Sequence, residues 1–388
     1  MSFEKSERLK KLPPYLFVEI DKAKKKARDE GRDIIDLGIG DPDLPTPNFV
    51  IDALNRAAKD PKTHKYPLDQ GLPEFRSSAA KWLRKRFGIE MNPDGEIHPL
   101  IGSKEGIAHM PLAFINPGDA VLVPDPCYPP YKSGTIFAGG EVITMPLKAE
   151  RNFLPDFKAI NHNLLGKVKM MFINYPNNPT GAVCDKKFLK DAVEFARKHN
   201  IIICSDAAYS EVAFDGYKPS SIFEIDGAKD VAIEFHSLSK TFNMTGWRLG
   251  FACGNRDLVE GLAKIKSNID SGVFFAIQWA GVAALEHYDA HMPRLLKIYE
   301  ERRDVLVEGL NKIGWNVEKP KATFYVWVKV PGRYTSATFA RDLLEKADIV
   351  ATPGNGFGEN GEGYIRMVIT VDKKRLAEAV ERIKKKLK

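Results

Sequence analysis

Residues 237–250 read SLSKTFNMTGWRLG and combine one lysine with several small hydroxyl side chains. The segment follows a short apolar run at residues 231–233 that predicts a strand. A lysine that is desolvated or close to another cation loses its proton easily, and the free amine of Lys240 would then attack an aldehyde. Ser237, Ser239 and Arg248 offer the donors that a phosphate dianion needs. Taken alone, the segment also fits a surface loop with an ordinary lysine.

A carboxylate stands at the end of another apolar run. Residues 201–209 read IIICSDAAY, so Asp206 follows a buried strand and Tyr209 follows it closely. Ligands of open α/β sheets bind at the carboxyl ends of the strands. A buried carboxylate needs a cationic partner, and a protonated pyridine nitrogen would supply one. The alternative interpretation is that Asp206 caps the N-terminus of a helix.

Two further segments carry polar groups at comparable positions. Residues 174–181 read NYPNNPTG and place an amide, Asn178, among turn formers after a strand, where it suits a phenolate or a carboxylate. A purely structural turn is the alternative. Residues 102–107 read GSKEGI and precede an apolar helix, whose free N–H groups and positive end could hold a phosphate. Taken alone, residues 102–107 give only weak evidence of a phosphate site.

The pattern of apolar runs predicts an α/β domain followed by a smaller unit. Short runs at residues 121–123, 170–173, 201–204, 231–233 and 249–253 suit strands of a mainly parallel sheet covered by helices. An amphipathic segment at 186–199 predicts a helix that crosses between two of them. After residue 285, a charged helix at 294–310, strands at 324–328 and 364–371 and further helices predict a second, α+β unit.

The N-terminal helix predicted at 19–30 ends at Gly31 and is expected to pack on that second unit. Because 388 residues exceed one ordinary core, we predict three parts: an arm at 1–45, a large domain at 46–285 and a small domain at 286–388.

Composition and charge exclude several classes of protein. Hydrophobic residues make up 44% and charged residues 28% of the chain, which indicates a globular protein. The net charge of +7 comes largely from lysine runs at 24–26 and 384–388, which are typical of solvated helix faces, so no nucleic acid is expected. The four cysteines show no metal or disulfide spacing, and the apolar stretch 272–285 is too short to span a bilayer. We therefore predict a cytoplasmic protein without a metal or a membrane partner.

Agreement of the four segments in type and order changes how each is interpreted. Together they resemble the class I/II pyridoxal-phosphate (PLP) aminotransferases of fold type I, and the resemblance covers nearly the whole chain. It implies a seven-stranded, mainly parallel sheet in the large domain, PLP as cofactor, and an amino acid and a 2-oxo acid as substrates. It also implies a homodimer with its sites at the interface, because Tyr66 matches a tyrosine that reaches the phosphate of the neighbouring subunit.

The resemblance also assigns roles to single residues. Lys240 would bond to the cofactor aldehyde and later move the proton at the substrate Cα, and Asp206 would pair with the pyridinium nitrogen. Tyr209 and Asn178 would bond the ring oxygen, and Tyr128 would stack on the ring. Arg366, in the segment 363–367, would clamp the substrate α-carboxylate through its planar fork. The phosphate would be held by Ser103, Lys104, Ser237, Ser239 and Arg248.

Within the family, residues 14–17, 36–43 and 102–109 are most similar to the branch that acts on LL-diaminopimelate. That similarity implies a reaction of LL-diaminopimelate with 2-oxoglutarate in lysine biosynthesis. It also implies substrate contacts from Tyr15, Gly40, Lys104, Tyr128, Asn178 and Arg366. Residues 268–272 read NIDSG where the branch has an Asn-Gly pair, which leaves the contacts to the distal group of the substrate open.

Three other functions remain open at the level of sequence. A broad-specificity enzyme acting on alanine, glutamate or aromatic amino acids would share nearly all of these residues. A PLP enzyme for β-elimination or decarboxylation would share Lys240 and Asp206. A non-catalytic regulator built on the same fold is less consistent with the chain, because no helix-turn-helix segment precedes Tyr15 and Lys240 stands in a full motif.

Overall fold

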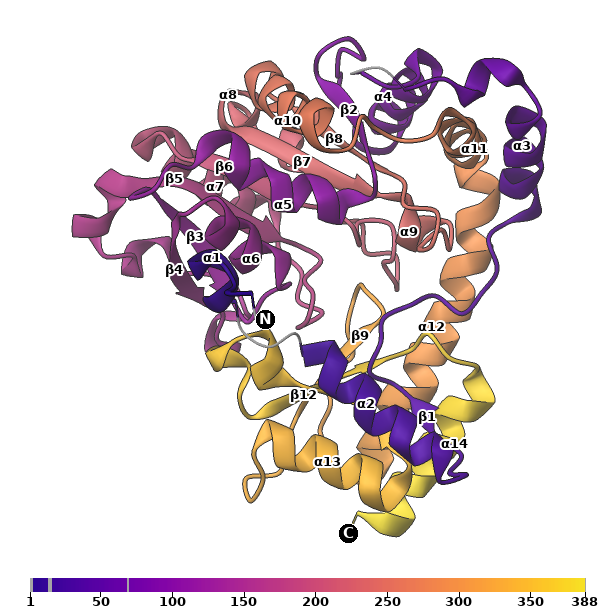
Figure 1. Ribbon diagram of the computed structural model, residues 1–388. Helices are drawn as coiled ribbons and strands as arrows, with labels where there is room; N and C mark the ends of the chain where they lie inside the picture. Colours follow the sequence, from indigo (N-terminus) through magenta and orange to yellow (C-terminus); the bar gives the residue numbers. More distant parts are fainter. Residues whose placement is uncertain (1–2, 13–15, 68–69, 388) are drawn as a thin grey trace.

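The structure is a computed structural model that describes residues 3–12, 16–67 and 70–387. Its centre is a seven-stranded sheet in the order β2-β8-β7-β6-β5-β3-β4 (Figure 1). All neighbouring strands pair in parallel except β8, which is antiparallel to both β7 and β2. The strands are β2 (Ile97–Leu100), β3 (Ala120–Asp125), β4 (Glu141–Pro146), β5 (Val168–Asn174), β6 (Ile202–Asp206), β7 (Ala232–Ser237) and β8 (Gly250–Gly254). The prediction of a mainly parallel α/β sheet is confirmed.

Helices cover both faces of this sheet because its strands are apolar on both sides. On strand β3, Val121 and Val123 pack in one cluster with helices α5 (Ser103–Phe114) and α10 (Arg256–Ile269). Leu122 points to the other face, where it packs in a cluster with helix α7 (Lys186–His199). Helix α7 connects the parallel strands β5 and β6, as predicted.

Two strands of the sheet were not predicted from apolar runs. Strand β4 lies at the edge of the sheet, and most of its side chains are exposed or half-buried, so it lacks the signature of a buried strand. Strand β2 is four residues long and includes His98 and Pro99. Beside β2 and β8, a further apolar cluster joins helices α3 (Asn48–Ala58), α4 (Pro73–Phe87) and α11 (Phe275–Glu286). The short helices α6 (Pro130–Phe137), α8 (Ala228–Val231) and α9 (Leu238–Thr241) complete this part.

A second core surrounds a three-stranded antiparallel sheet in the order β11-β12-β9. Its strands are β9 (Tyr325–Lys329), β11 (Thr352–Pro353) and β12 (Tyr364–Val368), packed with helices α13 (Ser336–Ala347) and α14 (Lys373–Lys386). The long helix α12 (Tyr288–Lys312) connects this core to the large sheet (Figure 1). It begins earlier than the predicted residue 294, because the backbone of His291 already bonds the carbonyl oxygen of His287 before Pro293 interrupts the ladder.

The N-terminal segment joins the second core. After α1 (Glu7–Lys10) and α2 (Leu16–Asp29), strand β1 (Ile35–Asp36) pairs with β10 (Ile349–Val350). Ile35 and Leu37 are buried in the second core. Helix α2 starts before the predicted residue 19, and Gly31 follows its end with a φ of 77°. The predicted boundaries at residues 45 and 285 stay a prediction.

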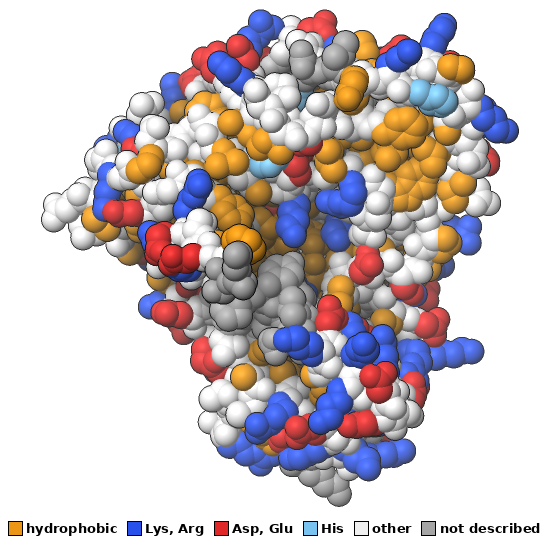
Figure 2. Space-filling model, in the orientation of Figure 1, with side chains coloured by type: hydrophobic (Ala, Val, Ile, Leu, Met, Phe, Trp, Pro, Cys, Tyr) orange, Lys and Arg blue, Asp and Glu red, His pale blue; other side chains and the backbone are white. Residues whose placement is uncertain are grey.

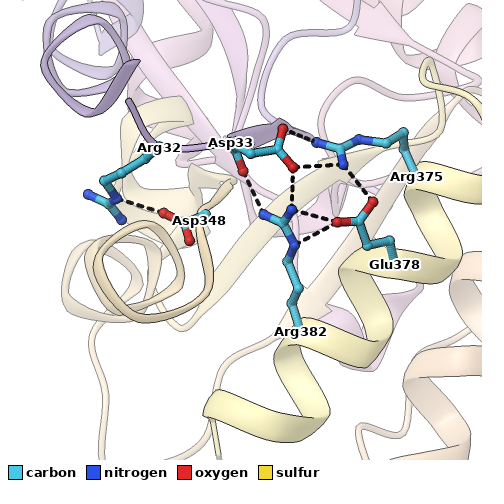
Figure 3. A network of polar contacts seen from close by, with 6 residues as sticks. All are labelled: Arg32, Asp33, Asp348, Arg375, Glu378 and Arg382. Atoms are coloured by element: carbon cyan, nitrogen blue, oxygen red, sulfur yellow. Dashed lines mark hydrogen bonds and ion pairs between the residues drawn. The ribbon is translucent and has the colours of Figure 1, made fainter. Parts of the chain in front are cut away.

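A network of charged side chains ties this segment to the C-terminal helix (Figure 3). The Asp33 carboxylate accepts hydrogen bonds from Arg375 at 2.7 and 2.9 Å, and Arg382 donates to the Asp33 carbonyl oxygen at 2.6 Å. Arg32 donates to Asp348 at the end of α13 over 2.6 Å. These contacts hold the chain before Gly40 against the second core. Within the described residues, no helix combines the length and apolar character that crossing a bilayer requires.

Candidate active site

The predicted polar residues surround one cavity of about 360 Å³ at the carboxyl ends of β5, β6 and β7. All of them line it except Tyr15 and Tyr66. The N-terminus of α5 contributes Ser103 and Lys104, and the second core contributes Arg366. The remaining predicted residues in the lining are Gly40, Tyr128, Asn178, Asp206, Tyr209, Ser237, Ser239, Lys240 and Arg248.

Lys240 lies on the short helix α9, directly after strand β7. Its Nζ donates to the carbonyl oxygen of Gly40 over 3.2 Å and lies 5.6 Å from the centre of the Phe324 ring. Burial lowers the pKa of Lys240 to about 8, with Arg248 and Arg366 adding to the effect. An amine with this pKa has a far larger neutral fraction at neutral pH than an ordinary lysine, which a nucleophile requires. The interpretation of residues 237–250 as an ordinary surface loop is therefore wrong.

Asp206 ends strand β6 and is 4% exposed. A turn and not a helix follows it, so it is no helix cap, although its Oδ1 accepts a hydrogen bond from the Ala208 N–H at 3.1 Å. Burial raises the pKa of Asp206, while the Tyr131 hydroxyl and the Ala208 amide oppose that rise. No described residue forms an ion pair with Asp206. A buried carboxylate without a counter-ion fits a cationic ring nitrogen, which would offset its desolvation.

The second oxygen of Asp206 is held by a residue that the sequence did not single out. The Tyr131 hydroxyl donates to Asp206 Oδ2 over 2.7 Å. Tyr131 lies on α6, is fully buried, and stacks on Phe172 with ring centres 4.8 Å apart. The one available signal was its position three residues after Tyr128, which brings both rings to the same side of the chain.

Another wall of the cavity carries an arginine and an amide that contact each other. Arg366 Nη1 donates to Asn178 Oδ1 and Nη2 donates to the Gly38 carbonyl oxygen, both over 2.8 Å. The Arg366 guanidinium also lies over the rings of Tyr325 and Phe357, at 4.3 and 4.6 Å. The turn at 174–181 is thus both structural and part of the cavity.

Tyr325 was also not identified from the sequence, because there it is indistinguishable from the other apolar residues of its strand. Its hydroxyl lies 2.6 Å from that of Tyr209, and a Cβ added to Gly40 would lie 2.5 Å from it. Only glycine therefore fits at position 40, which brings the backbone of the N-terminal segment into the cavity.

The wall formed by the start of helix α5 and Arg248 carries hydrogen-bond donors suited to a dianion. Gly102 precedes helix α5 with a φ of 73°, and a Cβ at this position would collide with the Arg248 guanidinium. Arg248 donates to the Thr245 carbonyl oxygen over 2.8 Å and approaches Ser239 Oγ at 3.5 Å. A helix N-terminus, hydroxyl groups and a guanidinium at one point match the chemistry of a phosphate.

Two of the predicted residues are not brought to the cavity of this chain. Tyr66 is 76% exposed and lies beyond the short helix at Pro61–His64. Tyr15 lies outside the described residues. The segment 268–272 does not line the cavity either: the Asp270 carboxylate pairs with Lys266 at 3.1 Å, and Ile269 is 57% exposed.

A desolvated amine, a buried carboxylate and a cradle for an anion in one cavity of a mainly parallel α/β sheet fit a PLP-dependent enzyme of fold type I. The chain matches the family model of class I and II aminotransferases over residues 32–383 and belongs to that family. It is a PLP-dependent aminotransferase, whose substrates are an amino acid and a 2-oxo acid.

Its relatives share nearly the whole length. The chain is 56% identical over 385 residues to an LL-diaminopimelate aminotransferase of Syntrophobacter fumaroxidans, which covers 99% of both chains. It is 54% identical to one of Moorella thermoacetica, over 99% of this chain and 98% of the other. Among solved structures, substrate-bound BacF of Bacillus subtilis has a TM-score of 0.96 at 40% identity, over 99% of this chain and 98% of that one. A single mutant of Thermus thermophilus aspartate aminotransferase has a TM-score of 0.92 at 30% identity, over 99% and 100%.

Proposed function

We propose that this aminotransferase transfers an amino group between LL-diaminopimelate and 2-oxoglutarate in lysine biosynthesis. The observation that carries the proposal is the identity of 50–56% over nearly the full length to relatives named LL-diaminopimelate aminotransferase. The geometry of the cavity supports the chemistry of the transfer, and the names of the relatives support the substrate.

Lys240 and Asp206 are the proposed catalytic pair. When bound, PLP supplies an aldehyde that takes up amino groups and a ring that accepts electrons from the substrate Cα. Lys240 Nζ would hold the aldehyde carbon until the substrate amine takes its place, and the freed amine would then accept the proton from the substrate Cα. Asp206 would keep a proton on the ring nitrogen through its negative charge. Tyr209, a further proposed catalytic residue, would bond the ring oxygen together with Asn178, and Tyr128 would stack on the ring.

The phosphate of the cofactor would be held at the wall formed by the start of α5 and Arg248. Ser103, Ser237, Ser239 and Arg248 would hold it, and Lys104 lines the same cavity. Because the N–H groups at the start of a helix point at such a ligand, α5 contributes backbone donors as well.

Substrate binding divides between an α-carboxylate end and a distal end. Arg366 takes the α-carboxylate, since Asn178 and Gly38 already hold its guanidinium in a fixed plane. A second zwitterionic end several bonds away needs polar partners, for which Lys104, Tyr15 and the backbone at Gly40 are the candidates. Lys104 would also receive the distal carboxylate of 2-oxoglutarate in the other half of the reaction.

The proposal includes a cytoplasmic homodimer. Tyr66 is too exposed to serve its own cavity, which supports its use by a second copy of the chain. Ile269 and Phe274 are exposed hydrophobic residues, and Figure 2 shows further hydrophobic side chains over the region of α11 and α3. Such a surface is typical of an interface. All four cysteines are free thiols, which supports a reducing compartment.

A substrate screen tests the proposed function. The purified enzyme with PLP is offered LL-diaminopimelate, alanine, glutamate or tyrosine with 2-oxoglutarate (oxaloacetate for glutamate), and the amino product and ammonia are measured. We expect LL-diaminopimelate to give one of the highest values of kcat/KM, with glutamate as product. Release of ammonia would identify a lyase. High turnover of tyrosine or alanine, together with little or no turnover of LL-diaminopimelate, would favour the broad-specificity alternative. The similarity to an aromatic aminotransferase of Pyrococcus horikoshii, at 32% identity, supports that alternative.

A further inference from the structure

A second and larger cavity lies between helix α4, the first half of helix α12 and residues 210–218. We name it the α4–α12 groove. Its volume is about 740 Å³, against about 360 Å³ for the catalytic cavity. Small-molecule sites have volumes of roughly 300–1,000 Å³ and combine apolar walls with a few polar groups. The groove has the size of a ligand site, and the proposed reaction makes no use of it.

Aromatic side chains form the apolar wall of the groove. Trp82 from α4 and Phe214 from the loop are 7% and 2% exposed, and Tyr217 and Tyr288 are half-buried. Rigid aromatic surfaces of this kind bind apolar groups at a low cost in conformational entropy. An apolar or aromatic group therefore fits between them.

One residue that lines the groove has a carboxylate oxygen without a hydrogen-bond donor among the described residues. Glu211 is 5% exposed, and its Oε2 accepts hydrogen bonds from Arg86 Nε at 2.9 Å and from the Tyr288 hydroxyl. Its Oε1 is buried and has no hydrogen-bond partner among the described residues. Because a buried carboxylate oxygen without a donor is costly, this atom favours a ligand that donates a charged hydrogen bond.

Two cations of the groove lack a counter-ion. Lys218 and Lys297 line it and are exposed, and neither forms an ion pair or hydrogen bond with any residue in the described parts of the chain. The other two basic residues of the lining are occupied, since Lys85 pairs with Asp289 and Arg86 pairs with Glu211. The lysines therefore favour an anionic group on the same ligand.

We propose that the α4–α12 groove binds an α-amino acid with an apolar or aromatic side chain. Its ammonium group faces the Glu211 carboxylate, its carboxylate faces Lys218 and Lys297, and its side chain lies on the aromatic wall. A phosphate or a dicarboxylic acid would bring a second negative charge toward Glu211. A polyamine would bring positive charge toward the two lysines, so a zwitterion satisfies both groups best.

The groove and the catalytic cavity are lined by neighbouring residues of one segment. Ser210 and Glu211 line the groove, while Ala208 and Tyr209, directly before them, line the catalytic cavity. A ligand beside Glu211 thus contacts the segment that leads into the catalytic cavity, and it also contacts α12, which connects the two cores. The inference does not depend on which amino acid the enzyme uses as substrate.

Equilibrium dialysis of the PLP-loaded enzyme with labelled α-methyl-L-phenylalanine tests this proposal. The probe has no hydrogen on its Cα, so it cannot complete transamination, and the cofactor absorbance reports how much of it occupies the catalytic cavity. We expect one more bound molecule per chain than the cofactor absorbance accounts for. The double variant Lys218→Ala/Lys297→Ala should weaken this additional binding about tenfold or more, because two charged partners are lost.

Lys198→Ala, which removes an exposed lysine on α7 that is not part of the groove lining, is the matched control and should bind as the wild type does. Glu211→Gln provides a second test from the opposite end of the ligand and should also lose the additional binding. The exposed lysine variants keep the test independent of any folding defect caused by a change beside Arg86. Binding that never exceeds the catalytic occupancy, or that is equal in the wild type and the double lysine variant, would overturn the proposal.

Discussion

Tyr131→Phe tests whether the orientation of Asp206 depends on a neighbouring hydroxyl group. The substitution removes the donor that lies 2.7 Å from Asp206 Oδ2 and leaves the ring stacked on Phe172. Because Tyr131 is fully buried, no bulk water replaces the lost donor. A hydrogen bond to a charged group contributes about 1.5–3 kcal/mol, so kcat should fall by roughly ten- to a hundredfold if the bond acts fully in the transition state.

The pH dependence has a definite sign. The Tyr131 hydroxyl favours the ionised form of Asp206 and so lowers its pKa against the effect of burial. Without it, the pKa of Asp206 rises and the carboxylate becomes protonated at a higher pH. The acid limb of the pH profile of kcat should therefore move upward, and the proton on the ring nitrogen of the cofactor should be lost more easily.

The assay compares kcat, KM and a pH titration of the cofactor absorbance in the wild type and in Tyr131→Phe. We expect KM to change little, because Tyr131 does not line the cavity. Tyr175→Phe is the matched control: its hydroxyl donates to the Phe153 carbonyl oxygen over 2.7 Å, away from the cavity lining. A Tyr131→Phe enzyme with kcat within twofold of the control and an unchanged titration would refute the reasoning.

Four further outcomes are expected. Lys240→Ala should lose turnover by several orders of magnitude yet retain PLP, because the nucleophile and proton carrier is lost while the phosphate cradle remains. Borohydride labelling of another lysine in the wild type would contradict this assignment. In the cofactor-free protein, the rate of bond formation with PLP should rise with pH and level off above about 8, since only the neutral amine of Lys240 attacks; a flat profile would disprove it. Asp206→Asn should depress transamination far more than cofactor affinity, and activity within a few fold of wild type would count against the assigned role. Lys104→Ala and Tyr15→Phe should lower kcat/KM for LL-diaminopimelate roughly five- to a hundredfold more than for alanine, with Lys198→Ala as control; equal losses on both substrates would contradict a distal role.

The sequence alone determined five of the seven strands of the large sheet and most residues of the catalytic cavity. Asp206, Asn178 and Lys240 were found because each follows an apolar strand closely, and parallel strands bring their carboxyl ends to one edge of a sheet. The helix start at Ser103 was found for the same reason, since a glycine and small polar residues precede an apolar helix. Such signals depend on neighbouring residues in the sequence, so they can be recognised without knowledge of the remaining fold.

Only the tertiary structure decided which groups from distant parts of the chain complete the cavity. Gly40 and Tyr325 come together because the N-terminal segment lies on the second core, held by the Asp33 network and the pairing of β1 with β10. The bond from Tyr131 to Asp206 joins residues 75 positions apart, and in the sequence Tyr131 is one more apolar residue of a short helix. The periodicity of apolar residues indicates which face of a helix or strand is buried. The packing between elements determines which side chains contact each other, and both the Gly40–Tyr325 and the Tyr131–Asp206 contacts depend on that packing.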